Sequence, residues 1–310
     1  MKRILCIILA ALLVCLSGCG AAPKNDKIQV IAAIFPQYDW ARQIIGDSEN
    51  VELNLLMDDG VDPHSFQPAV SDLVAVSNCD LLIYGGGESD NWLNNSEQSN
   101  RSRTMLALLP LLGEKVHTEE VVEGMQHHHE EEEAADEHFW LSLDYAAHCC
   151  RAIAQELCRL DPENEEVYQK NLESYEQQLA SLHADYQKTV NGAARDTILV
   201  CDRFPFRYLT EDYRLNYYAA FPGCSAECEA SFETILFLSE KAKELELDTL
   251  LITETGDSRI ARSVAENADK KDMEILVLDA MQSVSLKDAA HRSYLGTMEE
   301  NLTVLSAALN

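Results

Sequence analysis

Residues 163–192, ENEEVYQKNLESYEQQLASLHADYQKTVNG, contain the pattern that decides the fold. Apolar residues recur there at steps of three and four: Tyr168, Leu172, Tyr175, Leu179, Leu182 and Tyr186. This spacing places them in one stripe and predicts a single amphipathic helix. We expect it to run from about residue 163 to 190 and to stop at Asn191-Gly192. A helix of that length can connect two lobes rigidly.

Strand-like and helix-like segments alternate on both sides of this helix, which favours parallel sheets. We predict strands at 28–34, 51–57, 80–84, 197–201, 216–220, 248–253 and 274–278. We predict helices at 36–45, 68–77, 139–160, 232–247, 258–268 and 288–308, with Ser231 and Asp257 as N-caps. The predicted architecture is α/β: an N-terminal lobe (28–162), the linking helix (163–192) and a similar C-terminal lobe (193–310).

The first residues carry an export signal. Lys2 and Arg3 precede an apolar stretch at 4–16 that is too short to span a bilayer as a mature helix. Leu16-Ser17-Gly18-Cys19 resembles a bacterial lipobox. We therefore predict a signal peptide (1–18), lipidation of Cys19, a tether (19–27) and an extracytoplasmic location at the membrane. The alternative is an ordinary secretory signal.

The charge balance excludes one class of partner. The formal net charge is -29, so clustered basic residues for nucleic-acid binding are absent, whereas an acidic surface attracts cations. Residues 113–137 are polar and acidic and include His127, His128 and His129 followed by four Glu. We expect this loop to lack the apolar surface needed for order. It is either an accessory metal-binding loop or a solvated linker.

Metal-type ligands occur in four separate loops. Asp62-Pro63-His64 follows the second strand, and Asp136-Glu137-His138 precedes a helix. Cys201-Asp202-Arg203 and Thr253-Glu254-Thr255-Gly256-Asp257 end two strands of the C-terminal lobe. Loops after parallel strands are where such sheets bind ligands, and imidazoles with carboxylates suit Zn(II) and other first-row metals. A lone surface histidine is nevertheless more often solvated.

The cysteines do not indicate a zinc site of their own. No Cys-x-x-Cys pair occurs, so a four-cysteine structural zinc site is not expected. Cys224 and Cys228 lie close enough in sequence to form a disulfide bond, and the other thiols of the mature chain read as small buried residues.

From the lipobox to the C-terminus, the chain resembles the ZnuA-like zinc/manganese-binding lipoproteins of bacterial ABC importers (cluster A-I). The similarity lies in the segments around His64 and His138, in Tyr84-Gly85-Gly86-Gly87-Glu88-Ser89-Asp90-Asn91-Trp92 and in the His/acid loop. The resemblance implies two lobes joined by a backbone helix. It also implies His64 and His138 as ligands, Zn(II) as the transported ion, and an ABC permease with its ATPase as partners of a monomer.

The third ligand position departs from that family. Anchoring on Phe206 and Tyr208 puts Arg203 where the family has a histidine, and a guanidinium has no lone pair for a cation. Asp202 is the expected replacement, and Cys201 a weaker one. This departure leaves Mn(II) or Fe(II) as alternative ions.

Two acidic residues lie near the family's fourth ligand. Asp257 is expected either as a direct ligand or only as a helix cap, and Glu254 as a ligand or the partner of one.

An enzyme is the main alternative from another class. Two histidines and a carboxylate could activate a water molecule on zinc. The chain has no His-Glu-x-x-His, Gly-x-Ser-x-Gly or phosphate loop, so we predict a carrier rather than an enzyme. A metal-dependent adhesin or hydrolase remains the alternative.

Overall fold

The computed structural model describes residues 27–95, 103–127, 134–225 and 229–310. Its N-terminal half is built on a parallel sheet with the strand order β2-β1-β3-β4. The strands are β1 (Ile28–Ala32), β2 (Val51–Leu55), β3 (Leu81–Tyr84) and β4 (Thr104–Ala107). Leu81, Leu82 and Ile83 are fully buried, as expected for a central strand covered on both faces.

The C-terminal half repeats this arrangement with the strand order β6-β5-β7-β8, again parallel. Its strands are β5 (Thr197–Phe204), β6 (Asn216–Pro222), β7 (Thr249–Ile252) and β8 (Glu274–Val277). In both sheets the first strand in sequence lies between the second and the third. The predicted α/β fold is therefore confirmed, and each sheet has a switch in strand order where ligand-binding loops gather.

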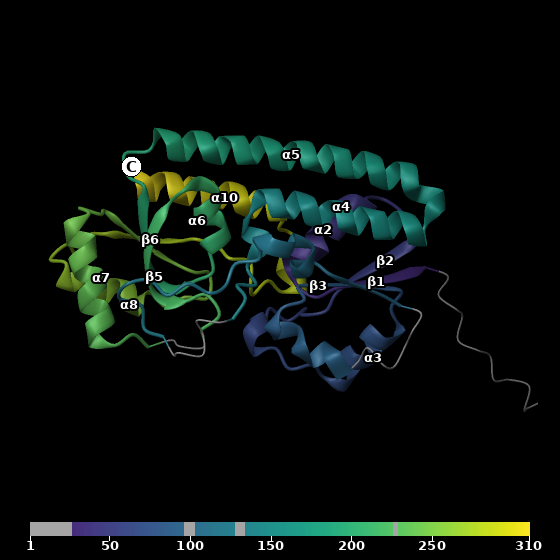
Figure 1. Ribbon diagram of the computed structural model, residues 1–310, viewed down its shortest axis with the longest axis horizontal. Coiled ribbons are helices and arrows are strands. Elements are labelled where there is room, and N and C mark those ends of the chain that lie inside the picture. Colours follow the sequence, from purple (N-terminus) through teal and green to yellow (C-terminus); the bar gives the residue numbers. More distant parts are fainter. Residues whose placement is uncertain (1–26, 96–102, 128–133, 226–228) are drawn as a thin grey trace, which may run out of the picture.

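The long predicted helix is α5 (Glu165–Gly192), and it extends over both sheets along one side of the molecule (Figure 1). All six apolar residues of its stripe are buried. They pack against α2 (Phe35–Ile45), α4 (Leu143–Leu160) and α10 (Tyr294–Leu309), so one continuous core contains residues of both halves.

Polar contacts at the start of α10 tie the two halves together. The Asp39 carboxylate accepts a hydrogen bond from the Tyr294 backbone N–H at 2.7 Å. The Arg42 guanidinium donates to the backbone carbonyls of Ala289 and Arg292, each at 2.7 Å. The Tyr294 hydroxyl donates to the Trp140 carbonyl at 2.5 Å. Because these groups are buried or partly buried, the contacts fix the relative position of the halves.

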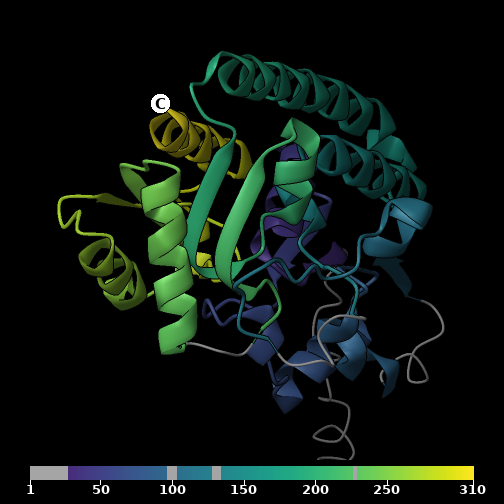
Figure 2. The ribbon, with the colours of Figure 1, turned by 60° about the vertical axis from the view of Figure 1, so that its left-hand side comes forward.

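Of the remaining helices, α3 (Val70–Asn78) packs on the N-terminal sheet, and α7 (Phe232–Glu244) and α8 (Ser258–Asn267) pack on the C-terminal sheet (Figures 1 and 2). The short helix α6 (Arg207–Tyr213) contacts α5, and α9 (Leu286–Ala289) precedes α10. The predicted N-caps are confirmed, since Ser231 accepts from the Thr234 N–H and Asp257 from the Arg259 N–H.

Three local predictions need correction. The short strand β4 and the helix α6 were not expected. The helix predicted at 288–308 begins only at Tyr294, because the Ser293 hydroxyl caps α10 by accepting from the Gly296 N–H. His291, expected inside that helix, therefore lies in the turn before it.

The ends of the His/acid loop are more ordered than predicted. The Glu119 N–H donates to Ala134 O at 2.7 Å, and the Asp136 N–H donates to His117 O at 2.8 Å. Met125 inserts into the core with 7% of its surface exposed. Backbone hydrogen bonds and the buried Met125 therefore order the two ends of this loop, although its composition is acidic. Residues 128–133 lie outside the described part of the chain.

Other predictions also fall on residues that are not described. These are the signal peptide and Cys19, together with His128 and His129. Within the described ranges, no helix combines the length and the apolar composition needed to cross a bilayer.

The buried stripe of α5 should dominate the stability of the protein. We expect Leu179→Ala to lower the free energy of unfolding by about 2–5 kcal/mol, because Leu179 is 1% exposed and its loss leaves a cavity. The matched control Glu173→Ala, on the exposed face of the same helix, should change it by less than about 0.5 kcal/mol. Denaturant unfolding measures both, and equal effects would contradict the packing described.

Candidate metal centre

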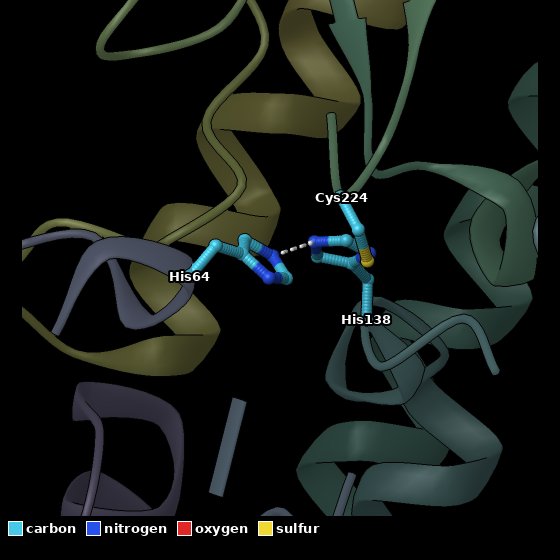
Figure 3. Close-up of side chains that lie close together, drawn as sticks. All are labelled: His64, His138 and Cys224. Atoms are coloured by element: carbon cyan, nitrogen blue, oxygen red, sulfur yellow. Dashed lines mark hydrogen bonds between the residues drawn. The ribbon is translucent and has the colours of Figure 1, made fainter. Parts of the chain in front are cut away.

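Two predicted histidines meet at the junction between the two halves of the chain, which we call the cleft (Figure 3). His64 lies on the short 3-10 helix η2 (Pro63–Ser65), and His138 directly precedes η6 (Phe139–Leu141). Their Nε2 atoms are 3.2 Å apart and face each other. The structure thus brings together two imidazoles that are 74 residues apart in sequence.

The same local motif presents both rings. In Asp62-Pro63-His64 and in Asp136-Glu137-His138, the first aspartate accepts the histidine backbone N–H through Oδ1, at 3.0 Å and 2.9 Å respectively. An aspartate that bonds the backbone two residues ahead forms a tight local turn. Each turn therefore fixes the backbone from which an imidazole projects.

The His138 ring is completely buried and its tautomer is set by Asp136. Asp136 Oδ1 lies 2.8 Å from His138 Nδ1, so Nδ1 carries the proton and the lone pair of Nε2 points into the cleft. Burial lowers the pKa of His138, but the carboxylates of Asp136, Glu119 and Glu137 together outweigh it and the net pKa is raised. A carboxylate behind the ring makes this nitrogen a better electron-pair donor.

His64 is held by a different partner. Its Nδ1 lies 2.9 Å from Ser89 Oγ, on η3 (Glu88–Asn95), and the Ser89 N–H donates to Glu137 Oε1 at 2.9 Å. Burial, followed by the nearby charge of His138, lowers the pKa of His64 to about 4. The ring is therefore neutral at physiological pH, the state that can bind a metal.

Cys224 is the third ligand-type side chain at this point. Its Sγ and a ring nitrogen of each histidine all lie within 4.8 Å of one another. Cys224 follows the carboxyl end of β6, and its thiol is free. The sequence analysis treated it only as a disulfide partner of Cys228, which lies outside the described residues. In the sequence, Cys224 follows shortly after the predicted strand at 216–220, and this position was the signal that could have identified it.

Gln282 is a second residue that the sequence analysis missed. Its Nε2 lies 2.9 Å from His138 Nε2, and its side chain is buried. The other amide atom, Oε1, has no hydrogen-bond partner among the described residues. Nothing in the local sequence marks this glutamine, because only the folded chain brings it to the histidine 144 residues away.

The predicted ligand Asp202 is placed differently. Its Oδ2 accepts hydrogen bonds from the Thr253 N–H at 3.2 Å and the Thr253 hydroxyl at 2.5 Å, and Oδ1 accepts from the Arg203 N–H at 2.8 Å. It belongs to no group of three ligand-type side chains in the described part of the chain. Its neighbour Cys201 is fully buried in the C-terminal core, as a strand-end cysteine often is.

Arg203 reaches across the cleft to the turn that carries His64. Its guanidinium donates to Asp62 Oδ2 at 2.6 Å, and both side chains are 15% exposed. Burial alone would raise the pKa of Asp62, but the Arg203 charge lowers it overall. The residue that replaces the family histidine therefore acts as an ion-pair partner of the His64 turn.

The other two predicted acids also have other contacts. Glu254 accepts the backbone N–H groups of Ala280 and Gln282, both at 2.8 Å, and burial raises its pKa to about 7. Asp257 accepts the Arg259 N–H and guanidinium, each at 2.7 Å, at the start of α8. Neither joins the His64–His138 group within the described ranges.

Of the accessory histidines, only His127 is described. It is partly buried, and its Nδ1 lies 3.4 Å from Met125 O.

The sequence and the fold of this chain are similar to those of known proteins. The model of the family described as zinc-uptake complex component A, periplasmic (ZnuA) matches residues 30–308. The chain belongs to this family. The resemblance seen in the sequence is therefore confirmed, and the family is one of solute-binding transport components rather than enzymes.

Individual relatives agree with this assignment. The chain is 26% identical to the high-affinity zinc uptake system protein ZnuA of Bacillus subtilis, over 97% of this chain and 96% of that protein. It is 26% identical to the zinc-binding lipoprotein AdcA of Streptococcus pneumoniae, over 98% of this chain but only 60% of AdcA. The Zn(II)-bound ZnuA-like domain of S. pneumoniae AdcA superposes with a TM-score of 0.72 at 22% identity, over 91% of this chain and 99% of that domain. At that identity the superposition supports the fold alone.

The contact between Asp136 and His138 leads to a prediction in the metal-free protein. Because the carboxylate raises the pKa of His138, Asp136→Asn should lower that pKa, which a proton NMR titration of the ring signals measures. The ring signals of His148, exposed on α4, should be the same in both proteins. An unchanged or higher pKa at His138 would contradict the role given to Asp136.

Proposed function

We propose that this protein captures Zn(II) outside the cytoplasm and delivers it to an ABC permease that is driven by an ATPase. The observation that carries the proposal is the approach of His64 Nε2 and His138 Nε2 to 3.2 Å. Family membership and the zinc-uptake role of the B. subtilis relative support it.

The distance between the two nitrogens fits a shared metal ion. Zn–N bonds of about 2.0–2.1 Å at the tetrahedral angle separate two ligand nitrogens by about 3.3 Å. The observed 3.2 Å therefore requires almost no movement of either ring. Asp136 and Ser89 already orient the two rings from behind, so the donor atoms are preorganised.

The placement of the site suits a carrier. His64 and His138 belong to the N-terminal half, whereas Cys224 and Gln282 come from the C-terminal half, so an ion would be enclosed from both sides. A catalytic zinc instead keeps an open position for substrate. A closed site between two halves can release its ion only when the halves separate, which a permease can induce.

The predicted acids act on this site indirectly in our proposal. Glu254 positions the Gln282 backbone, Asp202 holds the β5 and β7 ends together, and Asp257 caps α8. The acidic surface and the histidines at 127–129 would attract cations to the protein.

Attachment to the membrane completes the proposal. The lipobox supports lipidation of Cys19, and residues 19–27 would then tether a monomer close to the permease.

Removing the two imidazoles should abolish capture. We expect His64→Ala combined with His138→Ala to eliminate tight, one-to-one zinc binding in calorimetry, because both preorganised donors are lost. The control pair His148→Ala and His291→Ala, both exposed and remote from the cleft, should bind as the parent does. Tight binding by the first variant would refute the site.

A further inference from the structure

We propose that Cys224 is a direct ligand of the same ion, as a thiolate, and that this third donor makes the site selective for soft and borderline metals. The inference rests on the proposed function, because it assigns the coordination of the ion held by His64 and His138. It also replaces Asp202 as the source of the anionic ligand.

The position of the sulfur supports direct coordination. Zn–S and Zn–N bonds of about 2.3 and 2.0–2.1 Å put the sulfur about 3.6 Å from each ligand nitrogen. The Cys224 sulfur and one ring nitrogen of each histidine lie within 4.8 Å of one another, so a movement of roughly 1 Å or more would bring the sulfur to bonding distance of a shared ion. In Figure 3 the Cys224 side chain comes down beside the His138 ring, with its sulfur drawn over the end of that ring away from His64.

Two contacts hold the turn that carries Cys224 against the His138 ring. Glu119 is 6% exposed, and its carboxylate accepts the backbone N–H of Gly223 at 3.2 Å and that of Cys224 at 3.1 Å. Gly223 itself has no room for a side chain, since a Cβ there would lie 2.8 Å from Phe204 O and 3.0 Å from His138 Cε1. Glycine thus allows the backbone to pass against the imidazole and to place the next residue beside it.

An independent observation indicates a ligand at the same point. Gln282 is 3% exposed, its Nε2 is 2.9 Å from His138 Nε2, and its Oε1 has no hydrogen-bond partner among the described residues. A buried amide oxygen without a partner is unfavourable, because it has lost its hydrogen bonds to water without gaining another. Rotation of this amide would turn Oε1 to the ion as a fourth, neutral donor.

The charges around the cleft explain why a thiolate is needed. Arg203 stands at the strand end where the family resemblance expected a histidine, and its charge is balanced by Asp62 rather than offered to the ion. Asp136 and Glu119 lie beside His138 and Cys224. Burial and the negative charge of these carboxylates raise the pKa of the Cys224 thiol in the metal-free protein, and the same charge attracts a cation to this point. Cys224 is then the one ligand that can neutralise part of the cation directly within the described group.

Coordination by sulfur has a balanced proton count and a clear consequence. The Zn–S bond forms as the S–H bond of Cys224 breaks, and one proton leaves to solvent with no redox change. Thiolates favour Zn(II), Cd(II) and Co(II), whereas Mn(II) prefers oxygen ligands. The site should therefore discriminate against Mn(II) by its donor chemistry.

Cobalt(II) provides the direct probe, because a cobalt–thiolate bond gives a near-ultraviolet charge-transfer band that imidazole and carboxylate ligands do not. The mature, reduced protein is titrated with Co(II) alone and then displaced with Zn(II) or Mn(II). The parent should show this band at one equivalent. Cys224→Ser should lose it, and zinc affinity should fall by more than about 100-fold, beyond the loss typical of residues behind the ligands. Cys158→Ser, a free thiol on α4 away from the cleft, is the matched control and should behave as the parent.

A second variant tests selectivity without removing the charge. Cys224→Asp should lack the band, retain metal binding and show a lower ratio of zinc to manganese affinity than the parent. A charge-transfer band that persists in Cys224→Ser, or an unchanged zinc-to-manganese ratio in Cys224→Asp, would overturn the assignment of Cys224. Those results would leave the proposed function standing if the His64/His138 double variant still fails to bind zinc, whereas tight zinc binding by that double variant would overturn the proposed function itself.

Discussion

The Asp136 carboxylate holds His138 at both its backbone and its ring, and the arrangement of the whole cleft depends on that pair. The bonds at 2.9 and 2.8 Å fix the ring orientation and leave a single free nitrogen, Nε2. His64 and Gln282 lie at this nitrogen, and the turn of Cys224 packs against the same ring. Each of these residues comes from a different loop, and all of them contact the imidazole of His138.

The contacts around His138 persist only if the two halves of the chain keep their relative position. The stripe of α5 buries residues against helices of both halves, and the Asp39–Tyr294–Trp140 contacts join the start of α10 to the N-terminal half. The Arg203–Asp62 ion pair adds a bond across the cleft itself. Because Arg203 belongs to the C-terminal half and Asp62 to the N-terminal half, separation of the two halves at this point would break the ion pair.

The sequence predicted the architecture well because periodicity is a local property. The spacing of the α5 stripe and the alternation of strands and helices determined the two lobes, and the confirmed caps Ser231 and Asp257 show that helix starts were also readable. The short strand β4 was not predicted, because four residues are too few to show a clear periodicity.

The residues of the site were harder to predict from the sequence than the fold. His64 and His138 stood out by their motifs, and Cys224 offered only its place after a predicted strand, whereas Gln282 is brought to the site by long-range folding alone. Asp202 has the right chemistry for a ligand, yet its carboxylate bonds to Thr253 instead.

The central claim is that one ion is bound by two imidazoles and one thiolate between the halves. X-ray absorption at the zinc edge, on the one-to-one complex of the mature reduced protein, tests it most directly. The account predicts a shell with two imidazole nitrogens at about 2.0–2.1 Å and one sulfur at about 2.3 Å. A shell without sulfur, or one without two imidazole nitrogens, would contradict it.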